Sequence, residues 1–312
     1  MDFNGKKVIV NGVTGFIGSN ITKELVKQGA EVYSIDNYSY IDLDMAKTKL
    51  PFLNQIKIVE GDVSKKESWD KLPQDAEYIF HFAAPSSITL FNREPKKCYD
   101  ETVHGLFNAL EYAKANGTKK VVYPSTGSLY AGNEMPHHEG IYHKPRNLYA
   151  AAKVACEGLA ASYSDFVKSI GLRIFAGYGP GEEWKKDFAS VVYLFIKDIN
   201  EGRAPVIFGN GKQTSDFVYI DDVVEGALKA AEVDYIGVIN IGTGNPTSFN
   251  ELYETIKEAL EKNTEVTYIN KEKNYVEDLR ADTTIMKQVL DINPRSTKEG
   301  ITDFIEYLKL NH

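Results

Sequence analysis

The sequence predicts an α/β fold in which a doubly wound parallel sheet is joined to a smaller, mixed α/β substrate lobe. Three observations support this prediction. Short apolar runs rich in β-branched residues alternate with helical segments over the first 175 residues. A glycine-rich loop follows the first of these runs, and an acidic residue ends the second. The chain has 312 residues, 43% of them hydrophobic, which is enough for one large or two modest cores.

The first strand is expected at 6–10 and leads into a loop at 11–18 whose glycines are spaced three residues apart. A helical pattern follows and stops at Gly29. Glycines at this spacing allow a tight turn, close approach of the backbone to a pyrophosphate, and close packing of the helix on the strand. The loop therefore predicts a Rossmann dinucleotide site. The residues expected to hold the dinucleotide are Gly12, Gly15, Phe16, Ile17 and Gly18.

The second strand, expected at 31–35, ends at Asp36. An acidic residue at this point reaches the 2′-hydroxyl of the cofactor ribose, and its charge would repel a 2′-phosphate. We therefore expect NAD rather than NADP, and we include the next residue, Asn37, among the cofactor-binding residues.

Later strands and helices continue the alternation that is typical of a parallel sheet. Strands are expected at 56–59, 78–82, 120–123 and 172–175, and the longest helices at 95–116 and 147–168. After Phe175 the elements become shorter, and two capping boxes, Ser248 with Glu251 and Ser296 with Glu299, each begin a helical run. We predict an NAD-binding domain at 1–175, with return segments at about 214–245. A substrate-binding lobe is expected at 176–213 and 246–312.

Tyr149 and Lys153 lie four residues apart near the start of the helix expected at 147–168. This spacing puts a phenol and an ammonium on one helical face, and a nearby cation favours the phenolate, so the pair can act as a base. Taken alone, such a pair is more often exposed on the surface; the nicotinamide implied by the glycine loop gives the base a role. The pair is expected beside an apolar stripe that packs on the sheet. The stripe comprises Leu148, Ala152, Ala155, Leu159, Tyr163 and Phe166.

Charge and cysteine content exclude several classes of protein. A net charge of −8 without a basic block argues against nucleic acid or an anionic membrane as a partner. No apolar stretch approaches 18 residues, and the polar amino terminus is not that of a signal peptide. Cys98 and Cys156 lack metal-ligand spacing and suit a reducing cytoplasm. No metal is expected, and the histidines of the segment 137–143 are interpreted as surface residues of a loop.

With the glycine loop, Asp36 and the Tyr149/Lys153 pair in one chain, the sequence resembles the extended short-chain dehydrogenase/reductase family, the NAD-dependent nucleotide-sugar epimerases and dehydratases. The resemblance extends over nearly the whole chain. Matching motifs occur at 12–18, 61–63, 81–84, 125–130, 172–180, 216–222 and 240–244. It implies that Asp62 and Val63 lie on the adenine side of the cofactor. Phe82, Ala83 and Ala84 would lie along the cofactor.

The resemblance also implies a mechanism. Tyr149 would take a proton from a sugar hydroxyl while NAD takes the hydride. Lys153 would lower the pKa of Tyr149 and hold the nicotinamide ribose, and Thr126 would donate a hydrogen bond to the reacting oxygen. Return of the hydride to the other face of the keto-sugar would give an epimer and leave NAD bound.

Dehydratases and decarboxylases of this family carry carboxylates directly after the catalytic threonine, where this chain has Gly127 and Ser128. The sequence therefore favours an epimerase that acts at C4 of a UDP-hexose. A dehydratase or an epimerase acting at another carbon is an alternative, particularly if Glu134 or Glu139 folds back towards the site. A catalytically silent NAD-binding regulatory protein is a third hypothesis.

Substrate contacts depart from the family pattern. The family often has asparagine where this chain has Thr102 and Ala176, and an arginine that pairs with the nucleotide diphosphate is replaced by Ser215. The missing charge could come from Lys212, Lys271, Lys273 or Arg280. The substrate-binding residues are predicted as Ser87, Thr126, Ala176, Gln213 and Arg280. The resemblance further implies a homodimer formed by the helices near 95–116 and 147–168.

Overall fold

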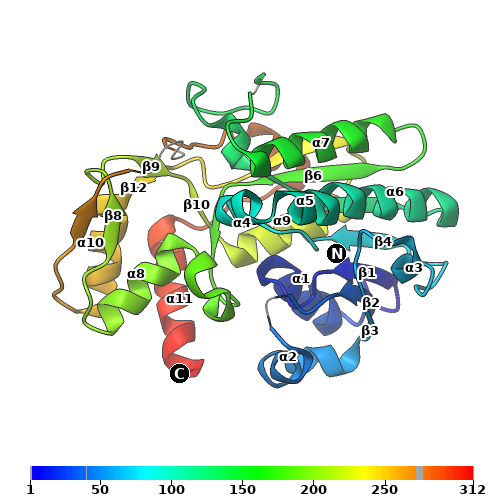
Figure 1. Ribbon diagram of the computed structural model, residues 1–312, viewed down its shortest axis with the longest axis horizontal. Helices are drawn as coiled ribbons and strands as arrows, with labels where there is room; N and C mark the ends of the chain where they lie inside the picture. Colours follow the sequence, from blue (N-terminus) through cyan, green and yellow to red (C-terminus); the bar gives the residue numbers. More distant parts are fainter. Residues whose placement is uncertain (1, 40, 143, 272–276, 312) are drawn as a thin grey trace.

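The centre of the computed structural model is a seven-stranded, entirely parallel sheet, which confirms the predicted α/β class (Figure 1). The structure describes residues 2–39, 41–142, 144–271 and 277–311. The strand order is β11-β6-β5-β4-β1-β2-β3, so the sheet winds outward in both directions from β1 and β4. Its strands are β1 (Lys7–Asn11), β2 (Glu31–Asp36), β3 (Lys57–Glu60), β4 (Tyr78–His81), β5 (Lys120–Thr126), β6 (Ser169–Ile174) and β11 (Gly237–Ile241).

Helices cover both faces of the sheet because its strands are apolar on both sides. Along β1, Val8 and Val10 belong to one buried cluster while Ile9 belongs to the other, as the alternation of side chains across a strand requires. The first face carries α1 (Phe16–Lys27) and α9 (Ile220–Glu232), which pack together, and the second carries α6 (Gly105–Asn116) and α7 (Leu148–Ser162). Shorter helices at the sheet are α2 (Leu43–Lys49), α3 (Lys66–Trp69), α4 (Ile88–Arg93) and α5 (Pro95–Tyr99).

A second group of elements lies beyond one end of the sheet (Figure 1). It contains α8 (Val191–Asn200), α10 (Phe249–Leu260) and α11 (Thr297–Asn311), and α10 packs against both other helices. Three two-stranded sheets accompany these helices. They pair β7 (Ala176–Tyr178) with β10 (Phe217–Tyr219), β8 (Val206–Phe208) with β13 (Thr267–Ile269), and β9 (Thr214–Ser215) with β12 (Thr247–Ser248). The predicted domain boundaries stay a prediction, although the return strand β11 does join the large sheet.

Both capping boxes predicted from the sequence form at the starts of helices. The Ser248 hydroxyl accepts a hydrogen bond from Glu251 N, and the Glu251 carboxylate accepts one from Ser248 N, which completes the first capping box at α10. Ser296 and Glu299 form the same reciprocal bonds at the start of α11.

The two longest predicted helices differ from expectation. The helix expected at 95–116 forms as α5 and α6 joined by a π-helical turn at Asp100–His104. The helix expected at 147–168 ends at Ser162, and the predicted apolar stripe is confirmed only in its middle: Ala152 is buried, and Leu159 and Tyr163 pack against a buried cluster. Its two ends are wrong, because Leu148 is 51% exposed and Phe166 is 64% exposed. The buried face of α7 also carries Tyr149 and Lys153. Its small residues let this face pack closely, so the catalytic candidates face inward.

Within the described ranges, no helix combines the length and apolar character needed to cross a bilayer.

Candidate active site

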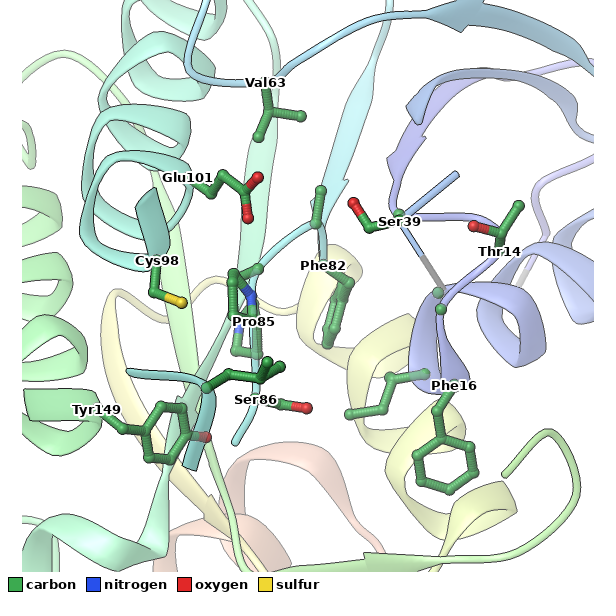
Figure 2. A pocket seen from close by; sticks show the side chains of 18 of the residues that line it. Thr14, Phe16, Ser39, Val63, Phe82, Pro85, Ser86, Cys98, Glu101 and Tyr149 are labelled. Atoms are coloured by element: carbon green, nitrogen blue, oxygen red, sulfur yellow. The ribbon is translucent and has the colours of Figure 1, made fainter. Parts of the chain in front are cut away.

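A cavity of about 440 Å³ opens at the carboxyl ends of the central strands (Figure 2). Parallel strands place these ends at one edge of the sheet, where ligands of doubly wound folds bind. Two walls face each other across it. We call the residues 12–18, 35–37 and 82–84 the cofactor wall, and the lining residues Ile174, Phe175, Gly177, Trp184 and Lys185 the substrate wall. The predicted residues that line the cavity are Gly12, Gly15, Phe16, Ile17, Gly18, Asp36, Asn37, Val63, Phe82, Ala83, Ala84, Thr126, Tyr149 and Lys153.

The glycine loop leaves no room for side chains at two of its glycines. Gly12 has φ +79°, and a Cβ there would lie 2.9 Å from the backbone of Ala83. A Cβ at Gly18 would lie 2.1 Å from the carbonyl oxygen of Gly12. Helix α1 begins after Gly15 without a side-chain cap, so its first amides point to the cavity as donors for an anion. The residues present therefore fit a dinucleotide pyrophosphate.

Asp36 is buried at the end of β2 and organises the loop beside it. Its carboxylate accepts hydrogen bonds from Thr14 N and Thr14 Oγ1, both at 2.9 Å, and from Tyr38 N at 2.8 Å. Burial raises the pKa of Asp36, and the bonds from Thr14 and Tyr38 oppose this rise. A carboxylate has about four acceptor positions, so one stays available for a ribose hydroxyl.

Tyr149 and Lys153 are both buried, which excludes the interpretation of the pair as surface residues. The Lys153 ammonium lies 5.9 Å from the centre of the Tyr149 ring and donates a hydrogen bond to Pro124 O at 2.9 Å. Burial raises the pKa of Tyr149, while its hydrogen bond with Thr126 lowers it. Burial also lowers the pKa of Lys153. The net pKa shift of the phenol is therefore upward, against the sequence expectation, because desolvation outweighs the nearby polar groups.

A buried polar cluster supports the strand end behind Thr126. The Ser125 hydroxyl donates to the Glu157 carboxylate at 2.5 Å, and Arg173 donates to both oxygens of Glu157 at 2.9 and 2.7 Å. Arg173 also donates to the Tyr130 hydroxyl at 2.6 Å, and that hydroxyl donates to the Asn240 side chain at 2.9 Å. This cluster joins α7, β5, β6 and β11 directly beneath the catalytic candidates.

The segment after Thr126 is anchored to the same cluster. Glu139 accepts a hydrogen bond from Asn240 N at 2.8 Å, while Glu134 is exposed, and neither lines the cavity. His137 is fully buried and stacks on Tyr130 at 5.0 Å, so its interpretation as a surface residue is wrong. The backbone contacts of the imidazole with residues 133 and 280 explain the burial. His138 is exposed, and His143 lies outside the described residues.

Several predicted residues do not line the cavity. Ser87 caps α4, where its hydroxyl accepts a hydrogen bond from Leu90 N, and Ala176 belongs to the strand pair β7–β10. Gln213 is buried and donates to Phe208 O at 2.6 Å, and Asp62 accepts a hydrogen bond from Ser64 N. Arg280 lies on a separate cavity of about 280 Å³ and donates to Gly244 O. Their binding roles stay predictions.

The structure also brings in residues that the sequence analysis did not select. Ser86, Cys98 and Glu101 line the cavity (Figure 2). Trp184 and Lys185 line the substrate wall. These residues belong to no motif. Lys185 lies 170 residues after Gly15, so no local sequence pattern indicates that it lines the same cavity as the glycine loop. Across the described residues, no group of three His, Cys, Asp or Glu side chains could hold a metal ion.

Comparisons with known proteins agree with this geometry. The model of the NAD dependent epimerase/dehydratase family matches residues 8–242. A UDP-glucuronate 4-epimerase of Thermodesulfobacterium geofontis is 31% identical over 97% of this chain and 96% of its own length. The structure of the UDP-glucose 4-epimerase of Thermotoga maritima with UDP-glucose has a TM-score of 0.91 at 30% identity, covering 98% of this chain and 99% of the other. The UDP-glucuronic acid 4-epimerase of Bacillus cereus, solved with UDP-glucuronic acid and NAD, has a TM-score of 0.87 at 25% identity and covers 98% and 100%.

Proposed function

Because this chain belongs to the NAD dependent epimerase/dehydratase family, with NAD as its cofactor, we propose that it inverts C4 of a UDP-hexose. The observation that carries the proposal is the juxtaposition of Thr126, Tyr149 and Lys153 with the glycine loop in one cavity. Relatives that are named or solved as UDP-sugar 4-epimerases over their full length support the choice of carbon and nucleotide.

Each catalytic candidate has a role that its position supports. The Tyr149 phenolate takes the proton from the C4 hydroxyl and later returns it to the keto oxygen. Thr126 donates a hydrogen bond to that oxygen, and the Lys153 ammonium binds the nicotinamide ribose. Because burial raises the pKa of Tyr149, the phenolate needs the positive charge of Lys153, 5.9 Å from the ring, to oppose this rise. NAD, which the glycine loop and Asp36 would hold, would supply reversible acceptance of the C4 hydride. The keto-sugar must turn over between the two transfers, which needs the open volume beside the substrate wall.

The absence of a carboxylate directly after Thr126, and the positions of Glu139 and Glu157, favour epimerisation over elimination or decarboxylation. Elimination of water needs an acid and a base in addition to the hydride acceptor. Gly127 and Ser128 follow Thr126, and Glu139, which could have folded back, is bound to the backbone of β11 instead. Glu157, which contacts the residue before Thr126, is held by Ser125 and Arg173 and does not line the cavity.

A panel of UDP-, dTDP-, GDP- and CDP-sugars incubated with the protein and followed by NMR tests the proposal. We expect reversible interconversion of two UDP-hexoses that differ at C4, with no net change in absorbance near 340 nm. A stable keto-sugar product would instead identify a dehydratase, and inversion at another carbon would identify a different epimerase. Bound NAD without turnover of any sugar nucleotide would favour a regulatory protein.

We also propose that the protein forms a homodimer through α6 and α7. Phe107 on α6 is 41% exposed and packs edge-on against Tyr163 at the end of α7, and Phe166 is 64% exposed beside them. These apolar side chains, from α6 and from the segment that follows α7, make a common surface that a second copy would cover.

A further inference from the structure

The replacement of the expected arginine by Ser215 leaves open which cation binds a diphosphate in this protein. Ser215 lies in the strand pair β9–β12 and does not line the cavity. Among the described residues, the cationic side chains that line the cavity are Lys97, Lys153 and Lys185. Lys97 is 60% exposed and pairs with Glu94, and Lys153 belongs to the catalytic pair. Lys185 is the remaining candidate.

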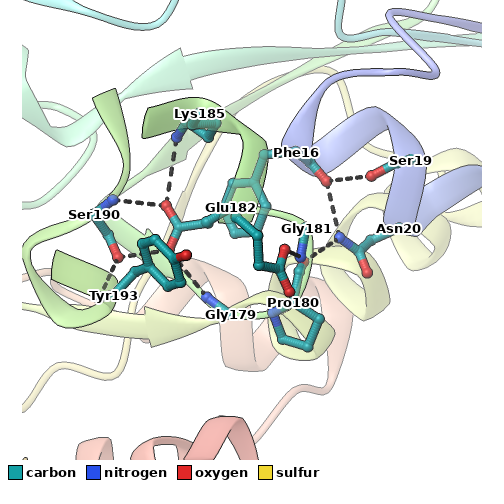
Figure 3. Close-up of polar contacts among 11 residues, drawn as sticks. Phe16, Ser19, Asn20, Gly179, Pro180, Gly181, Glu182, Lys185, Ser190 and Tyr193 are labelled. Carbon is teal, nitrogen blue, oxygen red and sulfur yellow. Dashed lines mark hydrogen bonds and ion pairs between the residues drawn. The ribbon is translucent and has the colours of Figure 1, made fainter. Parts of the chain in front are cut away.

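Lys185 faces the glycine loop from the substrate wall. Its ammonium lies 5.1 Å from the centre of the Phe16 ring, and Phe16 is the first residue of α1 (Figure 3). Its side chain is only 17% exposed. The ammonium therefore lies beside the side chain of the first residue of α1, the helix whose free amides fit a phosphate, in a partly desolvated position where charge interactions are strong.

Glu182 fixes the position of Lys185. The Glu182 side chain is fully buried and lies 3.4 Å from the Lys185 ammonium. It also accepts hydrogen bonds from Ser190 N at 2.8 Å and from Ser190 Oγ at 2.6 Å. An ammonium has three donors, and the one long contact with Glu182 leaves others for a ligand. Burial raises the pKa of Glu182, and Lys185 and Ser190 oppose this rise.

The same segment is attached to α1. Asn20 of α1 donates a hydrogen bond to Pro180 O at 2.8 Å, and its nitrogen also contacts Phe16 O at 2.9 Å (Figure 3). The loop that presents Lys185 is thus fixed to the helix that presents the glycine loop. The other cations considered from the sequence are placed elsewhere: Lys271 pairs with Glu277, and Lys212 is exposed away from the cavity. Lys273 lies outside the described residues.

We propose that Lys185, held by Glu182, is the diphosphate-binding cation of this site. It takes the role of the arginine that the family has at position 215, where this chain has serine. The inference rests on the proposed function and names the residue that recognises the diphosphate. The diphosphate can come from the UDP-sugar or from the dinucleotide, because Lys185 lines the same cavity as the glycine loop.

The test compares Lys185→Gln with Lys185→Arg in the NAD-loaded protein. Two further variants serve as controls: Lys197→Gln removes a charge from the exposed side of α8, and Arg280→Gln removes the competing cation. Calorimetric titration gives the Kd of UDP and of UMP, and NAD released by acid after gel filtration gives the cofactor content per protomer. Thermal unfolding shows whether each variant is folded.

If Lys185 binds the substrate diphosphate, Lys185→Gln weakens UDP binding by about tenfold or more, as expected for a lost charge-assisted contact, and changes UMP binding less. NAD content then stays unchanged. If Lys185 binds the dinucleotide, NAD content falls and UDP binding is retained. In both cases Lys185→Arg keeps most of the binding.

The proposal is overturned if Lys185→Gln changes neither NAD content nor UDP affinity, or if Lys197→Gln causes the same loss. A loss of UDP affinity confined to Arg280→Gln would assign the role to that arginine. Failure of the proposed function is distinguishable, because the sugar products measured by NMR test the reaction, whereas UDP affinity and NAD content test Lys185 whichever carbon reacts. If the unmodified protein binds no UDP, the NAD measurement still tests Lys185.

Discussion

The cofactor wall and the substrate wall enclose the same cavity but are built differently. The cofactor wall consists of turns that directly follow β1, β2 and β4, so strand pairing fixes where its residues lie. The substrate wall consists of β6, β7 and the segment 179–190, which contacts of individual side chains hold against α1. Motif residues fill the first wall, whereas the second contains Trp184 and Lys185, which no motif marks. Changes in the two walls should therefore affect different ligands.

The largest expected effect is at Tyr149, the candidate base that lines the cavity. Tyr149→Phe removes the only atom of this side chain that can take a proton, so we expect kcat to fall by about a thousandfold or more. NAD content and thermal stability should stay the same, because the ring still packs against Phe91. NMR of the sugar products and acid release of NAD measure both quantities. Substantial surviving turnover would show that another group is the base.

The variant Glu157→Gln tests how much the buried polar cluster behind Thr126 stabilises the fold that carries both walls. Glu157→Gln leaves the 4% exposed Arg173 side chain without its counter-charge, which should lower the free energy of unfolding by about 3–5 kcal/mol in urea titrations. The matched control is Glu254→Gln, which removes a surface ion pair with Lys257 and should cost less than about 1 kcal/mol. Equal losses of unfolding free energy in the two variants would show that the buried cluster stabilises the fold no more than a surface ion pair does.

Asp36 tests the cofactor wall separately. Asp36→Asn removes the charge that accepts from Thr14 and Tyr38, and we expect NAD affinity to fall by about ten- to a hundredfold, with weaker discrimination against NADP. UDP affinity, measured by calorimetry, should be unchanged. Asp44→Asn on α2 is the control of equal charge. An unaltered preference for NAD over NADP would show that Asp36 does not discriminate between the two cofactors.

The smallest effect is expected at Ser87, which the sequence suggested as a substrate contact. Because its hydroxyl caps α4, Ser87→Ala should lower stability by about 1 kcal/mol and leave the KM for the sugar nucleotide unchanged. Ser248→Ala, which removes the cap of α10, is the matched variant for the stability loss. A severalfold rise in KM would instead place Ser87 at the substrate and extend the substrate wall to α4.

The part of the site that could be predicted follows from short-range rules. Gly18 is required by a backbone contact within the same turn, Gly12 adopts a positive φ that favours glycine, and Asp36 ends the strand next to β1. The family motif also led to Thr126 at the cavity. The failures involve long-range packing. His137 is buried because Tyr130 and residue 280 surround it, and the inward face of α7 depends on which helix side meets α4 and the sheet.

The sequence by itself determined the fold class, the family and NAD as the cofactor, and it selected the candidates for the catalytic groups, because these depend on motif spacing and on the alternation of strands and helices along the chain. Only the tertiary structure decided that Tyr149 and Lys153 are buried, that Glu157 is neutralised by Arg173, and that desolvation raises the pKa of the phenol. It also placed Lys185 against Phe16. Burial and contacts between distant segments arise from packing of the whole chain, which no local pattern encodes.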